Sequence, residues 1–519
     1  MKWLVVKLVL VLSLSLFFLN GGVSAASKDS DETVKPLPLS LDALIRLVKE
    51  KNERIIFQEL EWGVSREAVN SEKAIFEPDF VASLQHEKNA KRNTAEEFIA
   101  RSSTLFQGGD PSVFNERNND YSAAVEGLTP LGTRVRLGYT LQDISSNLTD
   151  HVAPGIRQYQ TFLGGSLEQP LLKNRGIDAT TAGIRIAEFE ADVAFQGYRQ
   201  ELMGVVFDAA SGYWDLVRAQ DSLRIRRDSV QHAEVLLKQN REWAKFGRIA
   251  ETEVLEAEAG LAVRKSLAIS AKQDLVSAMN RLRTLFSSSA AHEDATVRAV
   301  DPLRVEPVSA RLAETLQKAF ELRPEYLSSQ KKIKREGIRI AYAKNQRWPQ
   351  LDLKSSYGIN GLDSSADGSW QDAKDREFES WAVGLEFRIP IGGGKKTRSE
   401  LEAAKKKKQQ ALLEMKAVEV AVANAADTAV KNLRHAYEQV LKFENAVRLR
   451  ERLLRVEVAR FDAGKSNSRI LLEREEDLLE AKEAWLESRV NFKKSELNLG
   501  MAKGSLLLTY GIEIMEVTE

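Results

Sequence analysis

Apolar residues recur every seven positions along two long stretches of the chain, about 177–246 and about 395–463, and neither stretch contains a proline. A strict spacing of seven predicts long helices that pack with a left-handed supercoil. Each helix of roughly 70 residues would be about 105 Å long. The apolar positions are Phe195, Leu202, Ala209, Leu216, Leu223, Val230, Leu237 and Ala244 in the first stretch, and Leu433, Val440, Val447, Leu454 and Phe461 in the second.

Two shorter helical patterns, at about 40–76 and about 251–286, have roughly half this length, about 54 Å each. Two such helices placed end to end match one long helix. A long helix beside a stacked pair of shorter helices is therefore the predicted building block.

The building block occurs twice in the chain. SLEQPLLKNRG corresponds to GLEFRIPIGGGKK, so that Pro170 matches Pro390, and Gly247 matches Gly464 at the end of each long helix. Such internal duplication is a signal of architecture. It predicts a first structural repeat at 27–311, with a helix, strands at about 79–170, a long helix at about 177–246, a helix at about 251–286 and a linker. The second repeat, at 312–519, has a helix, strands at about 350–390, a long helix at about 395–463, a helix at about 468–503 and a short tail.

The strands are marked by alternation of apolar and polar residues. In WAVGLEFRIPI, one face carries Trp381, Val383, Leu385, Phe387 and Ile389. This alternation over about ten residues is typical of transmembrane β-strands, although a soluble antiparallel sheet with one wet face has the same pattern. Long polar connections at one end, with tight turns or helices at the other, favour the barrel. Patterns at 79–87, 121–128, 133–142 and 158–169 predict four strands in the first repeat beside two in the second, and we favour six strands per chain over four.

The first 26 residues are predicted to be a signal peptide. Two lysines precede an apolar run of about a dozen residues, and Val23-Ser24-Ala25 forms a small-residue cleavage site. The run is shorter than the about 20 residues that a bilayer-spanning helix needs. The chain has no cysteine, which excludes disulfides, thiolate metal sites and a lipid anchor built on cysteine. Its 75 basic and 75 acidic residues cancel, so the net charge favours no nucleic-acid partner.

The segment IPIGGGKKTRSE joins a strand to a helix through three glycines. A phosphate-binding loop would need a glycine five positions before Gly394 and a Ser or Thr directly after Lys395. Ile389 and Lys396 stand at those positions. We therefore interpret the segment as a flexible joint between a strand and a helix.

No enzyme chemistry is predicted. The five histidines are scattered without the spacing of a metal site, and no Ser/His/Asp set or pair of carboxylates stands out, so we expect no catalytic residue, metal or cofactor. The run Lys405–Lys408 is interpreted as a solvated helix surface.

The paired junctions LEQPLLKNRG and EFRIPIGGGKKTRSELEAAK, and the paired tips GRIAETEVLEAE and RFDAGKSNSRILLERE, resemble those of the TolC-like outer-membrane efflux proteins, which are trimeric channel-tunnels. The resemblance covers nearly the whole chain after the signal peptide. It implies a mixed α and β fold with internal duplication, in which an outer-membrane β-barrel shared by a trimer continues as a long coiled-coil α-helical periplasmic tunnel. It also implies contacts with outer-membrane lipid and a location in the outer membrane of a Gram-negative bacterium.

The function that the resemblance implies is an outer-membrane exit duct of a tripartite efflux or type I secretion system. The duct is passive and is coupled to an inner-membrane pump through a periplasmic adaptor (membrane fusion) protein. The alternative is a non-channel coiled-coil structural protein or adhesin of the cell envelope. That alternative does not explain why an amphipathic strand ending in proline precedes each long helix.

The resemblance further implies a gate where the helical hairpins meet, locked by an acidic residue that bonds to a tyrosine and an arginine. Glu253 matches the acidic position, whereas Phe461, which has no hydroxyl, and Ser466 stand at the other two. A replacement lock through Lys465 or Arg469 stays open. The candidate gate and adaptor residues are Gly247, Arg248, Glu253, Glu256, Phe461, Gly464, Lys465, Arg469 and Glu473, and the candidate junction residues are Pro170, Gly176, Pro390, Gly392, Gly393 and Gly394.

Overall fold

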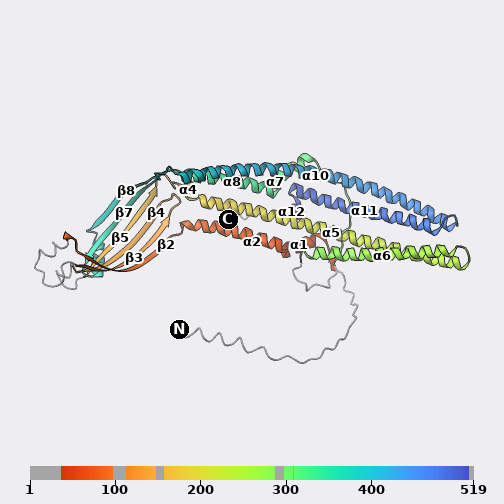
Figure 1. The fold of residues 1–519 in the computed structure, drawn as a ribbon, viewed down its shortest axis with the longest axis horizontal. Helices are drawn as coiled ribbons and strands as arrows, with labels where there is room; N and C mark the ends of the chain where they lie inside the picture. The colour runs from red at the N-terminus through yellow and green to blue at the C-terminus, as the bar shows by residue number, and fades with distance from the viewer. Residues whose placement is uncertain (1–36, 97–112, 148–156, 287–296, 308, 513–519) are drawn as a thin grey trace, which may run out of the picture.

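In this computed structural model the chain is long and narrow, with a sheet at one end and helices that extend away from it (Figure 1). The structure describes residues 37–96, 113–147, 157–286, 297–307 and 309–512. The predicted signal peptide, His151 and His292 lie outside the described residues.

Two long helices, α5 (Ala182–Lys245) and α10 (Lys395–Asp462), run along the helical part. At 1.5 Å per residue they are about 96 and 102 Å long. Helices α2 (Glu53–Lys73) and α6 (Glu251–Arg283) follow one another along α5, while α8 (Pro324–Asn345) and α11 (Ser468–Lys503) lie between α5 and α10. The shorter helices are α1 (Leu41–Lys51), η1 (Ala74–Phe76), α4 (Ile177–Thr180), α7 (Leu312–Leu322), α9 (Ala366–Asp375) and α12 (Leu506–Thr509). Among the described residues, no helix has both the length and the apolar content needed to cross a bilayer.

The first helical pattern is divided at Asn52, whereas the sequence predicted one helix over 40–76. The backbone N–H of Asn52 donates to the Val48 carbonyl (2.9 Å) and closes α1. Its side chain accepts from the backbone N–H groups of Arg54 (3.0 Å) and Ile55 (3.3 Å), which starts α2. Asparagine is a strong helix N-cap, so this one residue ends one helix and begins the next.

The large sheet has six strands, and every neighbouring pair is antiparallel. Its order is β2 (Asp79–Arg92), β3 (Val113–Leu128), β4 (Arg134–Ser146), β5 (Gln158–Pro170), β7 (Gln350–Asp363) and β8 (Glu379–Arg388). Six is the larger of the two strand numbers that the sequence allowed. Strands β2, β3 and β4 are longer than the alternation predicted, because the polar residues at their far ends still pair in register, as Lys88 does with Arg117.

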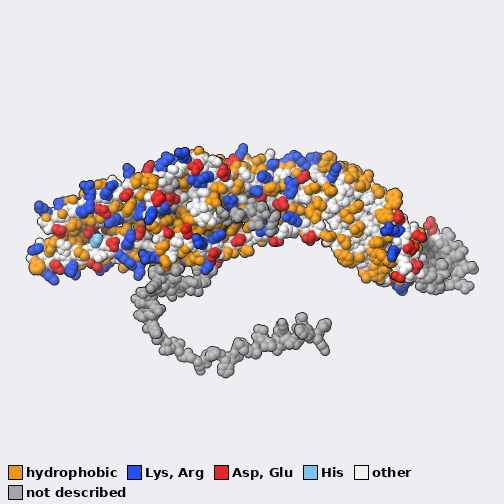
Figure 2. All heavy atoms as spheres, turned by 180° about the vertical axis from the view of Figure 1, so that it is seen from behind, with side chains coloured by type: hydrophobic (Ala, Val, Ile, Leu, Met, Phe, Trp, Pro, Cys, Tyr) orange, Lys and Arg blue, Asp and Glu red, His pale blue; other side chains and the backbone are white. Residues whose placement is uncertain are grey.

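One face of the sheet is apolar and exposed. The strand register places Phe80 opposite Val125, Val125 opposite Leu137, and Tyr357 opposite Trp381, so the apolar residues of all six strands share this face. Trp381 is 72% exposed even though it belongs to a regular strand. Figure 2 shows hydrophobic side chains covering the sheet end of the molecule. The exposed members include Phe80, Leu84, Tyr121, Val125, Leu137, Leu163, Leu167, Leu353, Tyr357, Trp381, Val383, Leu385 and Phe387.

The opposite face of the sheet is polar and carries charges of both signs. Arg136 pairs with Glu126 across β3 and β4, with 3.4 Å between Nε and Oε1. Lys354 pairs with Glu386 across β7 and β8. A sheet with one apolar and one charged face separates two different environments.

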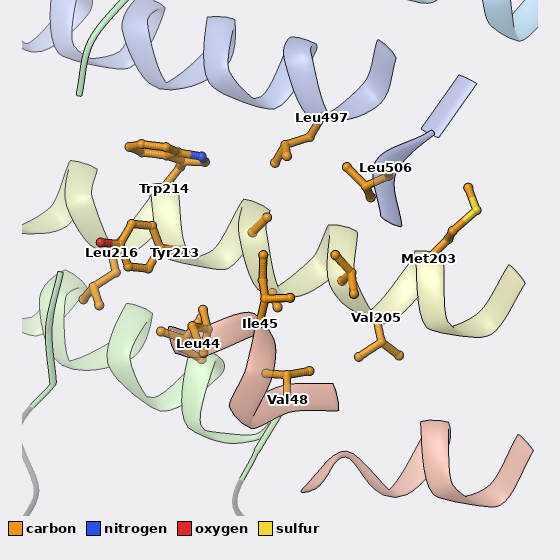
Figure 3. Packing of buried hydrophobic residues seen from close by; sticks show 14 of the residues in the cluster. Leu44, Ile45, Val48, Met203, Val205, Tyr213, Trp214, Leu216, Leu497 and Leu506 are labelled. Atoms are coloured by element: carbon orange, nitrogen blue, oxygen red, sulfur yellow. The ribbon is translucent and has the colours of Figure 1, made fainter. Parts of the chain in front are cut away.

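The apolar core lies in the middle of the helical part (Figure 3). There α1 supplies Leu44, Ile45 and Val48, which pack against the middle of α5, and residues of α6, α11 and α12 complete the cluster. A two-stranded parallel sheet of β1 (Leu37–Leu39) and β6 (Val297–Ala299) lies beside this core, and β6 belongs to the segment that the sequence treated as a linker. The Tyr213 hydroxyl donates to Oδ2 of Asp301 at 2.6 Å, and burial is the main cause that raises the pKa of Tyr213 to about 12.

Helix α9 occupies the connection between β7 and β8, which the sequence predicted to be a long polar link. Ser365 caps α9 by accepting a hydrogen bond from the Gly368 backbone N–H at 3.1 Å. The helix packs on the apolar face at the sheet end far from the long helices, where Ser369 contacts Thr161 (2.8 Å between hydroxyl oxygens) and Trp370 lies edge-on to Tyr139.

Candidate functional site

The candidate site lies at the two helical tips farthest from the sheet (Figure 1). The first tip is the turn between α5 and α6. Gly247 adopts a φ of 66°, the left-handed conformation that glycine tolerates best. Its N–H donates to the Ala244 carbonyl (2.9 Å), and the Arg248 N–H donates to the Trp243 carbonyl (2.9 Å). These two bonds form a Schellman motif, which ends α5.

The second tip, between α10 and α11, ends in the same way. Gly464 has a φ of 68°, its N–H donates to Phe461 (2.9 Å), and the Lys465 N–H donates to Arg460 (2.8 Å). The sequence match between Gly247 and Gly464 therefore reflects the same local geometry. Side chains of Arg248 and Lys465 are exposed at these tips.

A buried polar network joins the two tips. Oε2 of Glu253, in the first turn of α6, accepts a hydrogen bond from the Ser468 backbone N–H at 2.6 Å. Asn240 of α5 is fully buried and its Nδ2 donates to the Ser468 hydroxyl (2.7 Å) and to the Glu253 carbonyl (3.1 Å). Three residues from α5, α6 and α11 thus connect hairpins that are more than 200 residues apart in the sequence.

Aromatic packing supports this network. Phe461 is buried and stacks on Trp243 of the first hairpin, with ring centroids 5.5 Å apart. Leu236 and Leu471 complete this small apolar cluster. The residue at the tyrosine position of the resembled family therefore contacts the first hairpin through its ring and not through a hydroxyl.

The remaining predicted residues do not join the network. The Ser466 hydroxyl donates to Glu457 of its own hairpin. Among the described residues, no ion pair connects Glu253 to Lys465 or Arg469, whose side chains are exposed. Glu256 and Glu473 are also exposed. The sequence placed Glu253 in the site but missed Asn240 and Ser468. Ser468 bonds Glu253 through its backbone N–H, and Asn240 acts through a buried side-chain amide, and neither feature has a sequence motif.

A buried ion pair lies a few turns from the tips. Nη2 of Arg264 on α6 is 2.9 Å from Oε2 of Glu475 on α11, and their side chains are only 5% and 18% exposed. Burial raises the pKa of Glu475 above its ordinary value, although Arg264 and His232 act in the opposite direction. This pair links the same two hairpins as the Glu253 network.

The junction residues lie at the other end of the helices. Pro170 ends β5, and the N–H of Gly176, whose φ is 84°, donates to the Leu131 carbonyl at 3.2 Å. After β8, Gly393 and Gly394 have φ values of 70° and 65°, and the Gly393 N–H donates to the Pro390 carbonyl at 3.3 Å. Two of the three glycines, Gly393 and Gly394 but not Gly392, thus take the left-handed conformation where the strand turns into α10.

Comparisons with known proteins agree with this arrangement. Residues 315–505 match the model of the family described as outer membrane efflux protein. The outer membrane protein TolC of Vibrio cholerae is 23% identical over 323 residues, which cover 62% of this chain and 72% of that protein.

Two solved structures are similar in fold over most of the chain. The CmeC outer membrane channel of Campylobacter jejuni matches with a TM-score of 0.64 and 14% identity, covering 90% of this chain and 86% of that one. The open state of the MtrE outer membrane channel of Neisseria gonorrhoeae matches with a TM-score of 0.62 and 16% identity, covering 90% and 89%. The mixed helical and sheet fold is that of TolC-like channels, and the expected outer-membrane location with a helical part in the periplasm is confirmed. The chain is therefore similar to the TolC-like outer-membrane efflux proteins, both in residues 315–505 and in its overall fold.

Proposed function

We propose that three copies of this chain close one β-barrel in the outer membrane and continue into the periplasm as one helical tunnel, forming a passive exit duct. With six strands per chain, the barrel has eighteen strands, and a barrel of that size leaves a water-filled lumen. The duct does no chemistry of its own, and an inner-membrane pump supplies the energy.

The observation that carries this proposal is that the chain has two open lateral edges. Across the helices the order is α2 and α6, then α5, then α8 and α11, then α10. Across the sheet the order begins at β2 and ends at β8. Helix α2 leads into β2 and β8 leads into α10, so each edge continues from sheet to helices. If one edge of each copy packs against the opposite edge of the next, the copies form a closed ring when the rotation from one copy to the next divides a full turn evenly.

Exposed apolar side chains on both helical edges support the ring. On α2, Phe57, Leu60 and Val64 are 65–70% exposed and lie on the side of the helix opposite to buried Ile55 and Val69. On α10, Leu413 (66%) and Val420 (61%) lie opposite the buried side. Apolar surfaces of this kind mark protein contacts. The next copy would cover both surfaces.

The two faces of the sheet support its place in the membrane. The apolar face would contact lipid and the charged face would line the lumen, as in outer-membrane barrels. Aromatic residues occur near both ends of the apolar face, with Phe80 and Phe387 toward the helices and Tyr121, Tyr357 and Trp381 farther along the strands. Such aromatic girdles lie at the two membrane interfaces.

The helical tips form the gate in this proposal. The Glu253, Ser468 and Asn240 network holds the two hairpins of one copy together, and opening the tunnel would separate them. Exposed Glu256 and Glu473, together with Glu253, would give the constriction a negative charge that favours cations. The periplasmic adaptor would dock at the exposed tips, which include Arg248, Lys465 and Arg469.

The test is assembly of variants with a charge on the proposed edge. Leu413→Asp on α10 is expected to prevent the trimer, because it would place a carboxylate between two helices. Val235→Asp is the matched control. Val235 is 62% exposed, but it belongs to α5, which has neighbouring helices of the same chain on both sides and so does not form a lateral edge. Native mass measurement in detergent should give a trimer for the wild type and for the control. A soluble monomer with no need for detergent would instead favour the structural coiled-coil protein.

A further inference from the structure

The chain passes between the sheet and the helices at four places, and each carries basic side chains. These crossings are 73–77, 171–178, 343–350 and 389–399. Their only acidic residues are Glu77 and Asp178. Figure 2 shows Lys and Arg side chains on the helices next to the hydrophobic surface of the sheet. We define the basic collar as the eight basic residues of the crossings, which are Lys73, Lys173, Arg175, Lys344, Arg347, Lys395, Lys396 and Arg398.

Within one chain, the basic side chains of the collar lack acidic partners at ion-pair distance among the described residues. Asp178 is paired with Arg185 (2.9 Å) and Glu402 with Lys405 (2.7 Å), neither of which belongs to the collar. Among the described residues, no ion pair engages a collar side chain. The side chains of Lys395, Lys396 and Arg398 are exposed. The junction therefore presents basic side chains that form no ion pair among the described residues.

Exposed apolar residues lie at the same crossings. Trp348 is 59% exposed just before β7, Ile75 is 49% exposed just before β2, and Ile391 is 101% exposed just after β8. Leu131, in the turn between β3 and β4, is 56% exposed at the same end of the sheet. Tryptophan is enriched at membrane interfaces, and Lys and Arg extend from the apolar region so that their charges reach the headgroups.

We propose that the basic collar binds the phosphate groups of anionic phospholipids in the membrane leaflet that faces the helices. This inference rests on the membrane location of the sheet in the proposed function. Clusters of Lys and Arg immediately outside a membrane-spanning region attract anionic lipids, and the attraction falls off within a Debye length. The neighbouring apolar side chains favour a lipid over a free anion, because they would contact its acyl chains.

The direct test measures lipid binding to the full-length, detergent-solubilised assembly by native mass spectrometry. The probe is short-chain phosphatidylglycerol, with phosphatidylcholine as the neutral lipid. The collar variant combines Lys395→Gln, Lys396→Gln and Arg398→Gln. The matched control combines Lys442→Gln, Arg452→Gln and Arg455→Gln, which remove the same charge from exposed positions on the same helix, about 65 Å or more away at 1.5 Å per residue.

The wild type and the control variant are expected to bind phosphatidylglycerol more tightly than phosphatidylcholine. In the collar variant the affinity for phosphatidylglycerol should fall by about tenfold or more, since three basic residues near a membrane surface are lost. Raising the salt concentration to about 0.5 M should release the lipid from the wild type, which tests the collar even if the triple variant does not assemble.

Three results would overturn the collar. The first is equal affinity of the intact assembly for the two lipids. The second is an equal loss of binding in the collar and control variants. The third is displacement of phosphatidylglycerol by inorganic phosphate at similar concentration, which would indicate a simple anion site. If the trimer still conducts, none of these three results contradicts the proposed duct. A protein that needs no detergent would contradict both the duct and the collar.

Discussion

The Glu253 carboxylate accepts a hydrogen bond of 2.6 Å from the backbone N–H of Ser468, the first residue of α11 in the second hairpin. A carboxylate that bonds a backbone N–H at a helix start is held by a charge-assisted bond. This contact needs neither a tyrosine hydroxyl nor an arginine, so the substitution of both family positions by Phe461 and Ser466 does not leave the two hairpins unconnected. It joins the hairpins without Lys465 or Arg469, the two residues at which the sequence left a replacement lock open.

Replacing Glu253 is expected to weaken the closed tip. Glu253→Ala removes the acceptor for the Ser468 N–H, so the channel should open more often and bacteria should become more sensitive to large antibiotics. Glu253→Gln keeps an acceptor oxygen without the charge and should have a smaller effect. Glu242→Ala, which removes an exposed carboxylate from α5 near the same tip, is the control. Single-channel recordings in which Glu253→Ala matches the wild type would remove Glu253 from the gate.

The buried pair Arg264 and Glu475 gives a prediction about stability. Glu475→Leu would leave the Arg264 guanidinium buried without its partner, and we expect a loss of about 3–5 kcal/mol in the free energy of unfolding. The double variant Arg264→Leu/Glu475→Leu removes both charges and should be close to the wild type. Urea unfolding of the helical part, followed by circular dichroism in detergent, measures both. A double variant no more stable than the single one would contradict this account.

The raised pKa of Glu475 predicts the direction of a pH effect. Burial, assisted weakly by Glu476, makes the native state hold this proton to a higher pH than the unfolded chain, whose glutamate pKa is about 4.3. The native state therefore binds more protons in this window, and the stability that Glu475 contributes falls as the pH rises from about 4.3 through its raised pKa. The urea midpoint of the wild type should fall over this range more than that of Arg264→Leu/Glu475→Leu. Parallel pH profiles would count against the assignment.

The tip glycines give a prediction about local opening. An alanine at Gly247 or Gly464 must adopt a left-handed conformation, which costs about 1–2 kcal/mol. Hydrogen exchange of the tip amides should therefore become about 5- to 30-fold faster. Gly63→Ala is the matched control, because Gly63 lies inside α2 with open space around it, and there alanine should stabilise the helix by about 0.5–1 kcal/mol. Unchanged exchange at the tips would show that the Schellman motifs do not hold them closed.

Local patterns in the sequence predicted the parts of the fold that depend on periodicity. Alternation placed the apolar face of β8, and the spacing of seven placed α5 and α10, because both follow from which residues must be buried on one side of an element. The far ends of β2 and β3 were missed because most of their residues, at 85–92 and 115–120, are polar on both faces. Helix α9 was also missed, although Ser365 before a short helical segment was an available N-cap signal.

The candidate site was predictable only in part. Glu253 could be found from its position after Gly247, whereas its partner is a backbone N–H that any residue could supply. Asn240 looks like an ordinary helix residue in the sequence, and its role comes from contacts with Ser468, 228 positions away. Arg264 and Glu475 likewise meet only because α6 and α11 both pack on α5.

The most direct test of the duct is the ion conductance of the purified, detergent-extracted protein in a planar bilayer, with the trimer mass checked in the same preparation. We predict discrete channels from a trimer, of a size that fits eighteen strands better than twelve. The account would be contradicted by a protein of confirmed trimer mass that inserts into the bilayer but never conducts, if the Glu253→Ala variant does not conduct either.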